Sequence, residues 1–229
     1  MTQVAEPTFE TLSAQCGITL PPILSRLLEE GKTDYGRDQA DWKLNWRDYT
    51  LNAQPILSCV YDLEWISVDK ALQIVEIWLN PTFQNGRRFL PFAISGAGDA
   101  YCLMPMANGG IGAGLVWHDK AQSAVEMPSF ESFIFSKLVE SAADLEHLLD
   151  DFTPDEARRS VIVNIEVITP YLPRDLRDGL QILISGDLAG DESDPSLITV
   201  ETAETALSLL PAFEKEYFSV VPRWECGRR

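Results

Sequence analysis

Two apolar runs separated by a glycine-containing turn lie near the middle of this chain and constrain its fold more than any other feature. The runs are Phe89–Ile94 and Ala100–Met104, and the turn between them is Ser95–Asp99. Glycine tolerates the positive φ angles that tight turns require, and the flanking runs are rich in residues that favour strands. The pattern therefore predicts a β-hairpin.

The residues that follow predict further strands and a closing helix. A glycine cluster spans residues 109–114, after which Leu115–Asp119 and Ser123–Glu126 predict a third and a fourth strand. From about Phe130, apolar residues recur at helical spacing and predict an amphipathic helix. Strands joined by short turns pair antiparallel. We therefore expect a strand meander closed by a helix, which together build a core.

Helices are also predicted before the hairpin. Thr8–Gly17 and Ile23–Gly31 show helical spacing, with a capping residue or prolines at the start and a glycine at the end. Ser67 offers an N-cap to a predicted helix over residues 68–79. Pro55–Leu63 is apolar enough to predict a strand between these helices.

An alternation of aromatic and polar residues at 42–47 has two interpretations. Trp42, Leu44 and Trp46 alternate with polar residues, which is the period of a strand and predicts an edge strand. An exposed aromatic row would instead mark a binding face, because tryptophan is common among the residues that anchor partners. Both interpretations stay open from the sequence.

The chain changes character after about residue 140. Residues 1–140 hold 10 basic and 17 acidic side chains, and residues 141–229 hold 8 and 18. Thr153-Pro154 predicts a helix start, while residues 161–168 and Leu180–Ile184 predict strands. We therefore expect one domain over residues 1–140 and an acidic α/β C-terminal extension over residues 141–229 that packs on it.

The net charge of −17 limits the kinds of partner. Phosphate groups are bound through many lysine and arginine contacts, so this charge disfavours nucleic acid and anionic membranes as partners. It favours association with a basic protein and speeds that encounter at low salt. Plain solubility is the alternative use of the charge.

Other bulk features predict a reduced, cytoplasmic protein. The four cysteines are far apart and lack the spacing of metal ligands, and three lie in apolar surroundings typical of free buried thiols. We find no N-terminal signal pattern and no apolar run near the roughly 18 residues that a membrane span needs.

Catalytic and cofactor motifs are absent from the sequence. The two histidines exclude histidine-rich metal sites, and no phosphate-binding loop, zinc-protease motif or nucleophile elbow occurs. We therefore predict no enzyme activity, no cofactor and no metal. His118 and Asp119 are the one adjacent base and carboxylate, but neighbours on a strand point to opposite faces. An enzyme of unknown type around these two residues is the alternative hypothesis.

The chain resembles the Smi1/Knr4 family, the SUKH superfamily, over roughly residues 18–138. Six short pieces occur in the family's order: Leu20–Leu28, Trp65–Ala71, Phe89–Ala93, Gly96–Leu103, Gly114–Asp119 and Ser129–Ile134. The resemblance implies a SUKH-like α+β fold with a central, mainly antiparallel sheet flanked by helices. It also implies a binding function, because bacterial members are immunity proteins that bind a cognate polymorphic toxin, often a nuclease. Fungal members are regulatory interaction hubs, and the resemblance implies no catalytic set.

We therefore predict a non-catalytic immunity protein that neutralises a cognate toxin, or another basic protein, by direct binding through an acidic surface. A regulatory or scaffold protein without a toxin partner is the alternative. The candidate partner-binding residues are possible aromatic anchors and the carboxylates near them: Asp38, Asp41, Trp42, Trp46, Asp48, Trp117 and Asp119. The acidic loop Asp187–Asp194 is a further candidate contact, and a solvated loop or weak cation binding are its other interpretations.

Overall fold

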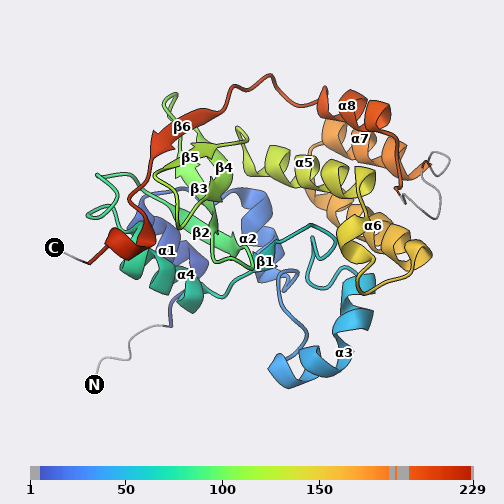
Figure 1. The fold of residues 1–229 in the computed structure, drawn as a ribbon, viewed down its shortest axis with the longest axis horizontal. Coiled ribbons are helices and arrows are strands. Elements are labelled where there is room, and N and C mark those ends of the chain that lie inside the picture. The colour runs from blue at the N-terminus through green and yellow to red at the C-terminus, as the bar shows by residue number, and fades with distance from the viewer. Residues whose placement is uncertain (1–5, 186–188, 190–195, 228–229) are drawn as a thin grey trace. The chain divides into compact units, whose positions relative to one another are not determined.

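The computed structural model describes residues 6–185, 189 and 196–227. Within them the chain has an α+β fold with eight α-helices, a four-stranded antiparallel sheet and a two-stranded sheet (Figure 1). It divides into two compact units, here called unit 1 and unit 2. Unit 1 comprises Met1–Arg26, Asp62–Phe130 and Phe213–Arg229, and unit 2 comprises Leu27–Tyr61 and Glu131–Ala212.

The units differ from the expected parts, residues 1–140 and 141–229, for two structural reasons. Residue 140 lies inside an unbroken helix, α5 (Phe130–Ala143). The last strand of the chain, β6 (Glu216–Ser219), pairs antiparallel with β5 (Gln122–Val125) and so belongs to unit 1. A cut in the sequence at one position therefore does not separate the two compact bodies.

Unit 1 contains both sheets. Its remaining elements are α1 (Phe9–Cys16), β1 (Glu64–Trp65), α4 (Val68–Ile74), the π-helix η1 (Val75–Leu79), β2 (Leu90–Ile94), β3 (Ala100–Pro105), β4 (Ile111–Val116) and the 3₁₀ turn η4 (Arg223–Glu225). The helix α2 (Pro22–Glu29) runs from unit 1 into unit 2. One core cluster contains large buried side chains from η1, the sheet and the last strand, including Trp78, Phe89, Met104 and Phe218.

The predicted hairpin is confirmed as β2 and β3. Ser95 N–H donates to the Asp99 carbonyl, and Gly98 N–H donates to the Ser95 carbonyl, so the turn closes on itself. Gly98 has φ +92°, the left-handed region for which a glycine is needed. The four-stranded sheet has the order β1-β2-β3-β4 with every neighbouring pair antiparallel.

The third strand begins earlier than predicted. It is β4, Ile111–Val116, so Gly112 and Gly114 of the glycine cluster lie within the strand and residues 117–119 lie after it. A Cβ on Gly112 would lie 2.7 Å from the Met127 carbonyl oxygen, and one on Gly114 would lie 2.5 Å from that of Ala124. These two glycines let β4 pass close to the backbone of residues 124–127. In the sequence alone, glycines with this role look the same as glycines of a turn.

Unit 2 is helical throughout its described elements. They are α3 (Gln39–Leu51), α5, η2 (Glu146–Leu148), α6 (Pro154–Ile168), η3 (Thr169–Tyr171), α7 (Arg174–Ser185) and α8 (Val200–Leu207). The predicted strands at 161–168 and 180–184 are wrong, because these residues belong to α6 and α7. The predicted strand at 55–63 is also wrong, since that segment is a series of turns.

Buried side chains at helical spacing explain why α6 and α7 are helices. Ala157, Val161, Ile165 and Ile168 form one buried face of α6, and its start is fixed by the predicted Thr153–Glu156 capping box. β-branched residues have only a weak preference for strands, which burial of one helix face overrides.

Candidate functional site

The negative charge of the chain is concentrated in unit 2. Unit 2 holds 23 acidic and 9 basic side chains, and unit 1 holds 12 and 9. Their net charges are therefore −14 and −3. A basic partner is accordingly attracted far more strongly to unit 2. The acidic loop Asp187–Asp194 contributes to this count, but its predicted role as a contact lies outside the described residues.

Within unit 2, the candidate residues at 38–48 lie on one helix, α3, and not on an edge strand. Asp38 is the N-cap of α3, and its carboxylate accepts hydrogen bonds from Ala40 N–H and Asp41 N–H at 2.9 Å. Such caps satisfy backbone donors that have no partner inside the helix. Asp38 is exposed, so it both starts the helix and presents charge to solvent.

Asp41 is buried and committed to internal contacts. Its carboxylate accepts bonds from the Arg37 guanidinium at 3.0 and 3.2 Å, from Tyr49 Oη at 2.6 Å and from Asn45 Nδ2 at 3.0 Å. The hydrogen bonds from Arg37 and Tyr49 hold the Asp41 pKa well below its usual range. Asp41 therefore stabilises the start of α3 and does not present a free carboxylate to a partner.

The two tryptophans of α3 are half-buried in aromatic contacts. Trp42 lies edge-on to Tyr35 with ring centroids 4.9 Å apart, and stacks on Tyr49 at 6.0 Å. Trp46 lies edge-on to Phe152 at 5.8 Å. These aromatic neighbours hold both indoles in place while leaving part of each accessible. A shallow hollow of about 450 Å³ lies beside Trp42 and is lined by Asp34–Gln39.

An exposed leucine on α3 was not among the predicted anchors. Leu44 is 84% exposed, the largest exposed fraction of any bulky apolar residue in the described chain. Asp48, one turn further along the helix, is also exposed. The period-two pattern in the sequence hid this arrangement, because it grouped Leu44 with the two tryptophans on one face. On a helix Leu44 instead faces solvent.

The position of α3 within unit 2 is fixed by Arg47. Its guanidinium forms an ion pair with Glu156 at 2.7 Å and lies over the Phe152 ring at 4.7 Å. Glu156 is also the capping-box residue of α6. Arg47 therefore ties α3 to the start of α6, so the exposed side chains of α3 stand on a supported helix.

Trp117 and Asp119 lie in unit 1, whereas the other candidate residues lie in unit 2. Trp117 is half-buried, with Lys120 Nζ 3.2 Å from its ring centroid, and Asp119 is exposed. Of the predicted partner-binding residues, the structure brings together the five of α3 and separately the two after β4.

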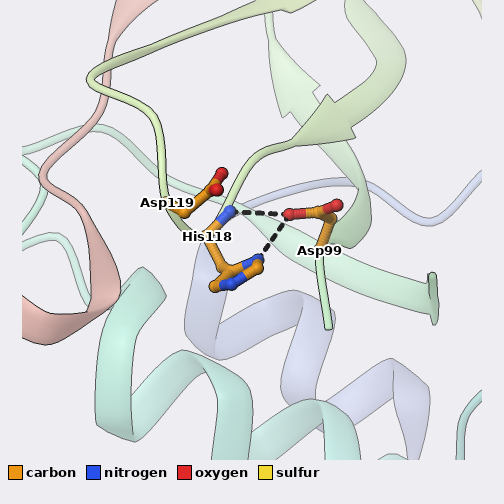
Figure 2. Close-up of side chains that lie close together, drawn as sticks. All are labelled: Asp99, His118 and Asp119. Atoms are coloured by element: carbon orange, nitrogen blue, oxygen red, sulfur yellow. Dashed lines mark hydrogen bonds and ion pairs between the residues drawn. The ribbon is translucent and has the colours of Figure 1, made fainter. Parts of the chain in front are cut away.

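His118 pairs with a carboxylate that sequence reasoning did not connect to it. Asp99 Oδ1 accepts His118 N–H at 2.9 Å and lies 2.7 Å from His118 Nδ1, whereas Asp119 makes no hydrogen bond to the ring (Figure 2). Asp99 is buried, and its Oδ2 accepts a bond from Ser95 Oγ at 3.1 Å. The register that pairs Ala100 with Val116 brings these residues together. That register is not readable from sequence.

The Asp99 carboxylate can orient the His118 imidazole, but no nucleophilic side chain accompanies this ring in the described residues. A proton on Nδ1 makes the bond to Asp99 and leaves the Nε2 lone pair free, as in a general base. No serine, threonine or cysteine side chain in the described chain hydrogen-bonds to the ring. Donor atoms of Asp99, His118 and Asp119 lie within 4.8 Å of one another. A cation there would compete with the bonds that Asp99 already accepts from His118 and Ser95.

The cysteines are free, as predicted. Cys16, Cys59 and Cys102 are buried, and Cys226 is partly exposed. Burial raises the pKa of the Cys16 thiol to about 11 and that of Cys59 to about 12. These thiols are therefore protonated at neutral pH and are poor nucleophiles and metal ligands.

Comparison with known proteins yields no relative: no family model, no curated protein and no solved structure matches the chain. In the described part of the chain, every helix is too short or too polar to cross a bilayer.

Proposed function

We propose that this chain is a non-catalytic binding protein that neutralises a basic protein by direct association, as an immunity protein does with its cognate toxin. The observation that carries the proposal is the charge of −14 on unit 2, against −3 on unit 1. The proposal includes a cytoplasmic site of action and a SUKH-like fold for residues 1–140. The antiparallel β1-β2-β3-β4 sheet and its helices are compatible with that fold.

Charge of this size and placement suits a nuclease-type toxin as the partner. Nucleases bind phosphate through clefts rich in lysine and arginine. An acidic surface is complementary to such a cleft, steers the encounter and competes with nucleic acid for the same groups. The charge of unit 2 therefore supports binding that also blocks the partner's activity.

The exposed side chains of α3 are the proposed contact. Leu44 supplies an apolar group that a partner can bury, and Asp48 and Asp38 supply charge on the same helix. Affinity in protein interfaces comes mainly from a few buried anchors, while surrounding charges set the rate of association. Trp42 and Trp46 add partly accessible ring surface that is already ordered by their aromatic neighbours.

The test uses the tagged full chain to capture partners from the cells that produce it, followed by binding kinetics on the captured protein. The matched variants are Leu44→Ser on α3 and Ile182→Ser on α7, since both side chains are exposed aliphatic groups on helices of unit 2. We expect Leu44→Ser to weaken binding about tenfold and Ile182→Ser to change it less than about twofold.

A single basic partner whose toxicity is suppressed by co-expression supports immunity. Several unrelated partners would favour the regulatory or scaffold function instead. Capture of no basic protein, or an equal effect of both serine variants, would contradict the proposed contact through α3.

A further inference from the structure

A small apolar pocket with a cationic rim lies in unit 1. Its volume is about 70 Å³, and it opens between α4–η1, the hairpin turn and the C-terminal segment. Four apolar side chains form its walls and three polar side chains stand at its edge: Ile74, Ile77, Trp78, Ile94, Lys70, Gln73 and Arg223, with Gly98 beside them. The space holds about five water-sized groups.

The walls of this pocket are held together by a chain of hydrogen bonds. Asp99 fixes His118, as Figure 2 shows, and the His118 carbonyl accepts Arg223 N–H at 2.9 Å. Trp78 Nε1–H donates to the Val221 carbonyl at 3.1 Å, which joins η1 to the same C-terminal segment. Asp99 is buried and His118 is half-buried, and through this pair the backbone of Arg223 is held at the edge of the pocket.

The rim carries two positively charged side chains, Lys70 and Arg223. Lys70 and Arg223 are exposed, and neither forms an ion pair with any described residue. Lys70 Nζ donates to Gln73 Oε1 at 3.3 Å, so the lysine is held beside the pocket by a neutral neighbour. Both cations line the same pocket, so an anion in it could contact the two together.

The local backbone is also irregular at this position. Val75–Leu79 forms a π-helix, and two of its residues, Ile77 and Trp78, line the pocket. Such widened turns are rare and occur often at functional sites. Ile77 remains 46% exposed, so apolar surface is left at the mouth of the pocket.

We propose that this pocket binds a small aliphatic carboxylate, with its branched hydrocarbon end between Ile74, Ile77 and Trp78 and its carboxylate between Lys70 and Arg223. A hydrocarbon group of four or five carbon atoms matches the volume, since it occupies about as much space as five water-sized groups. Lysine and arginine both form charge-assisted hydrogen bonds to carboxylates, and the apolar walls exclude water from the other end of the ligand. All of the residues that line this pocket belong to unit 1.

The experiment titrates 4-methylpentanoate into the ¹⁵N-labelled full chain and follows the indole N–H signals by NMR. We expect the Trp78 indole signal, assigned by its loss in Trp78→Phe, to shift with saturation at a Kd of about 1 mM. The uncharged isostere 4-methylpentanamide should bind about tenfold more weakly, because it lacks the charge that Lys70 and Arg223 recognise. Equal binding of the acid and the amide would overturn the proposal, as would the absence of a saturable shift.

Three variants separate the pocket from general electrostatic attraction. Arg223→Gln and Lys70→Gln each remove a rim charge and should each raise the Kd for 4-methylpentanoate at least about fivefold. Lys215→Gln removes one positive charge elsewhere in unit 1 and should leave the Kd unchanged. The three side chains are more than half exposed or at the surface, so the variants are expected to fold. A similar loss with Lys215→Gln would show that binding depends on total charge and would refute this pocket.

Discussion

At the residue scale, some carboxylates of this protein are buried and hydrogen-bonded, whereas others are exposed to solvent. Asp41 is enclosed by Arg37, Tyr49 and Asn45, whereas Asp48 is exposed on the same helix. Asp99 is buried and holds His118 in a different unit. Sequence reasoning placed Asp41 and Asp48 together as steering charges because spacing cannot show which carboxylate folds inward. Only side-chain packing separates structural carboxylates from those available to a partner.

Replacing Asp41 by asparagine should lower the melting temperature by a few degrees at pH 6. The folded Asp41 pKa is depressed by the hydrogen bonds from Arg37 and Tyr49. Its stabilising contribution is therefore fully present above the ordinary aspartate pKa of about 4 and is lost as the pH falls below it. The difference in melting temperature between wild type and Asp41→Asn should shrink from pH 6 to pH 2. Asp48→Asn is the control, and an Asp41→Asn deficit that grows on acidification would contradict this account.

Thiol accessibility provides a second residue-scale prediction. In the native protein at pH 8, an aromatic disulfide reagent should modify the partly exposed Cys226 and leave the buried Cys16, Cys59 and Cys102 unmodified. Burial raises the pKa of all four thiols, so the difference comes from access to the sulfur atoms. The measurement is the amount of reagent thiolate released per protein chain. We expect one equivalent before denaturation and four after it. Rapid release of more than one equivalent from the folded protein would show that the core around these residues is open.

At the element scale, residue periodicity and capping residues predict helices and strands correctly where the local sequence preference agrees with the side chains that become buried. The hairpin, α1, α2, α4, α5 and the start of α6 follow from glycine turns, caps and helical spacing in the sequence. The errors have a common cause. Residues 161–168 and 180–184 are β-branched or apolar runs whose helical form is decided by the face that they bury in unit 2. The pairing of β6 with β5 is long-range and left no local signal.

Gly114→Ala tests the close crossing of β4 and the segment after it. The added Cβ would lie 2.5 Å from the Ala124 carbonyl oxygen and 3.0 Å from Glu126 N, both backbone atoms. We expect a loss of about 1–3 kcal/mol in the free energy of unfolding, measured with urea. Gly96→Ala is the comparison, because its nearest neighbour is the movable Asp62 carboxylate at 3.1 Å. A smaller loss at Gly114 than at Gly96 would mean that the crossing is not tightly packed.

At the scale of the whole molecule, charge and fold are divided between two bodies. Unit 1 contains the sheets, the Asp99–His118 pair and the cationic pocket, and unit 2 contains the helices and most of the negative charge. The basic partner is proposed from the net charge, and that charge is evident from composition. Its concentration in unit 2 was not, because each unit is assembled from stretches far apart in the sequence. The sequence therefore predicts individual candidate residues, but it does not predict which of them share a compact unit.

The most direct test of acidic binding is the association rate constant of the captured partner at low and high salt for two triple variants. One neutralises exposed carboxylates of unit 2 (Asp48→Asn, Asp150→Asn and Asp175→Asn), and the other neutralises exposed carboxylates of unit 1 (Glu64→Gln, Asp69→Asn and Glu225→Gln). We predict that the unit 2 variant associates about tenfold more slowly at low salt and that the difference disappears at high salt, because steering is screened. The unit 1 variant should differ from wild type by less than about twofold. Equal slowing by both variants, or an association rate that is independent of salt, would contradict binding through the acidic unit.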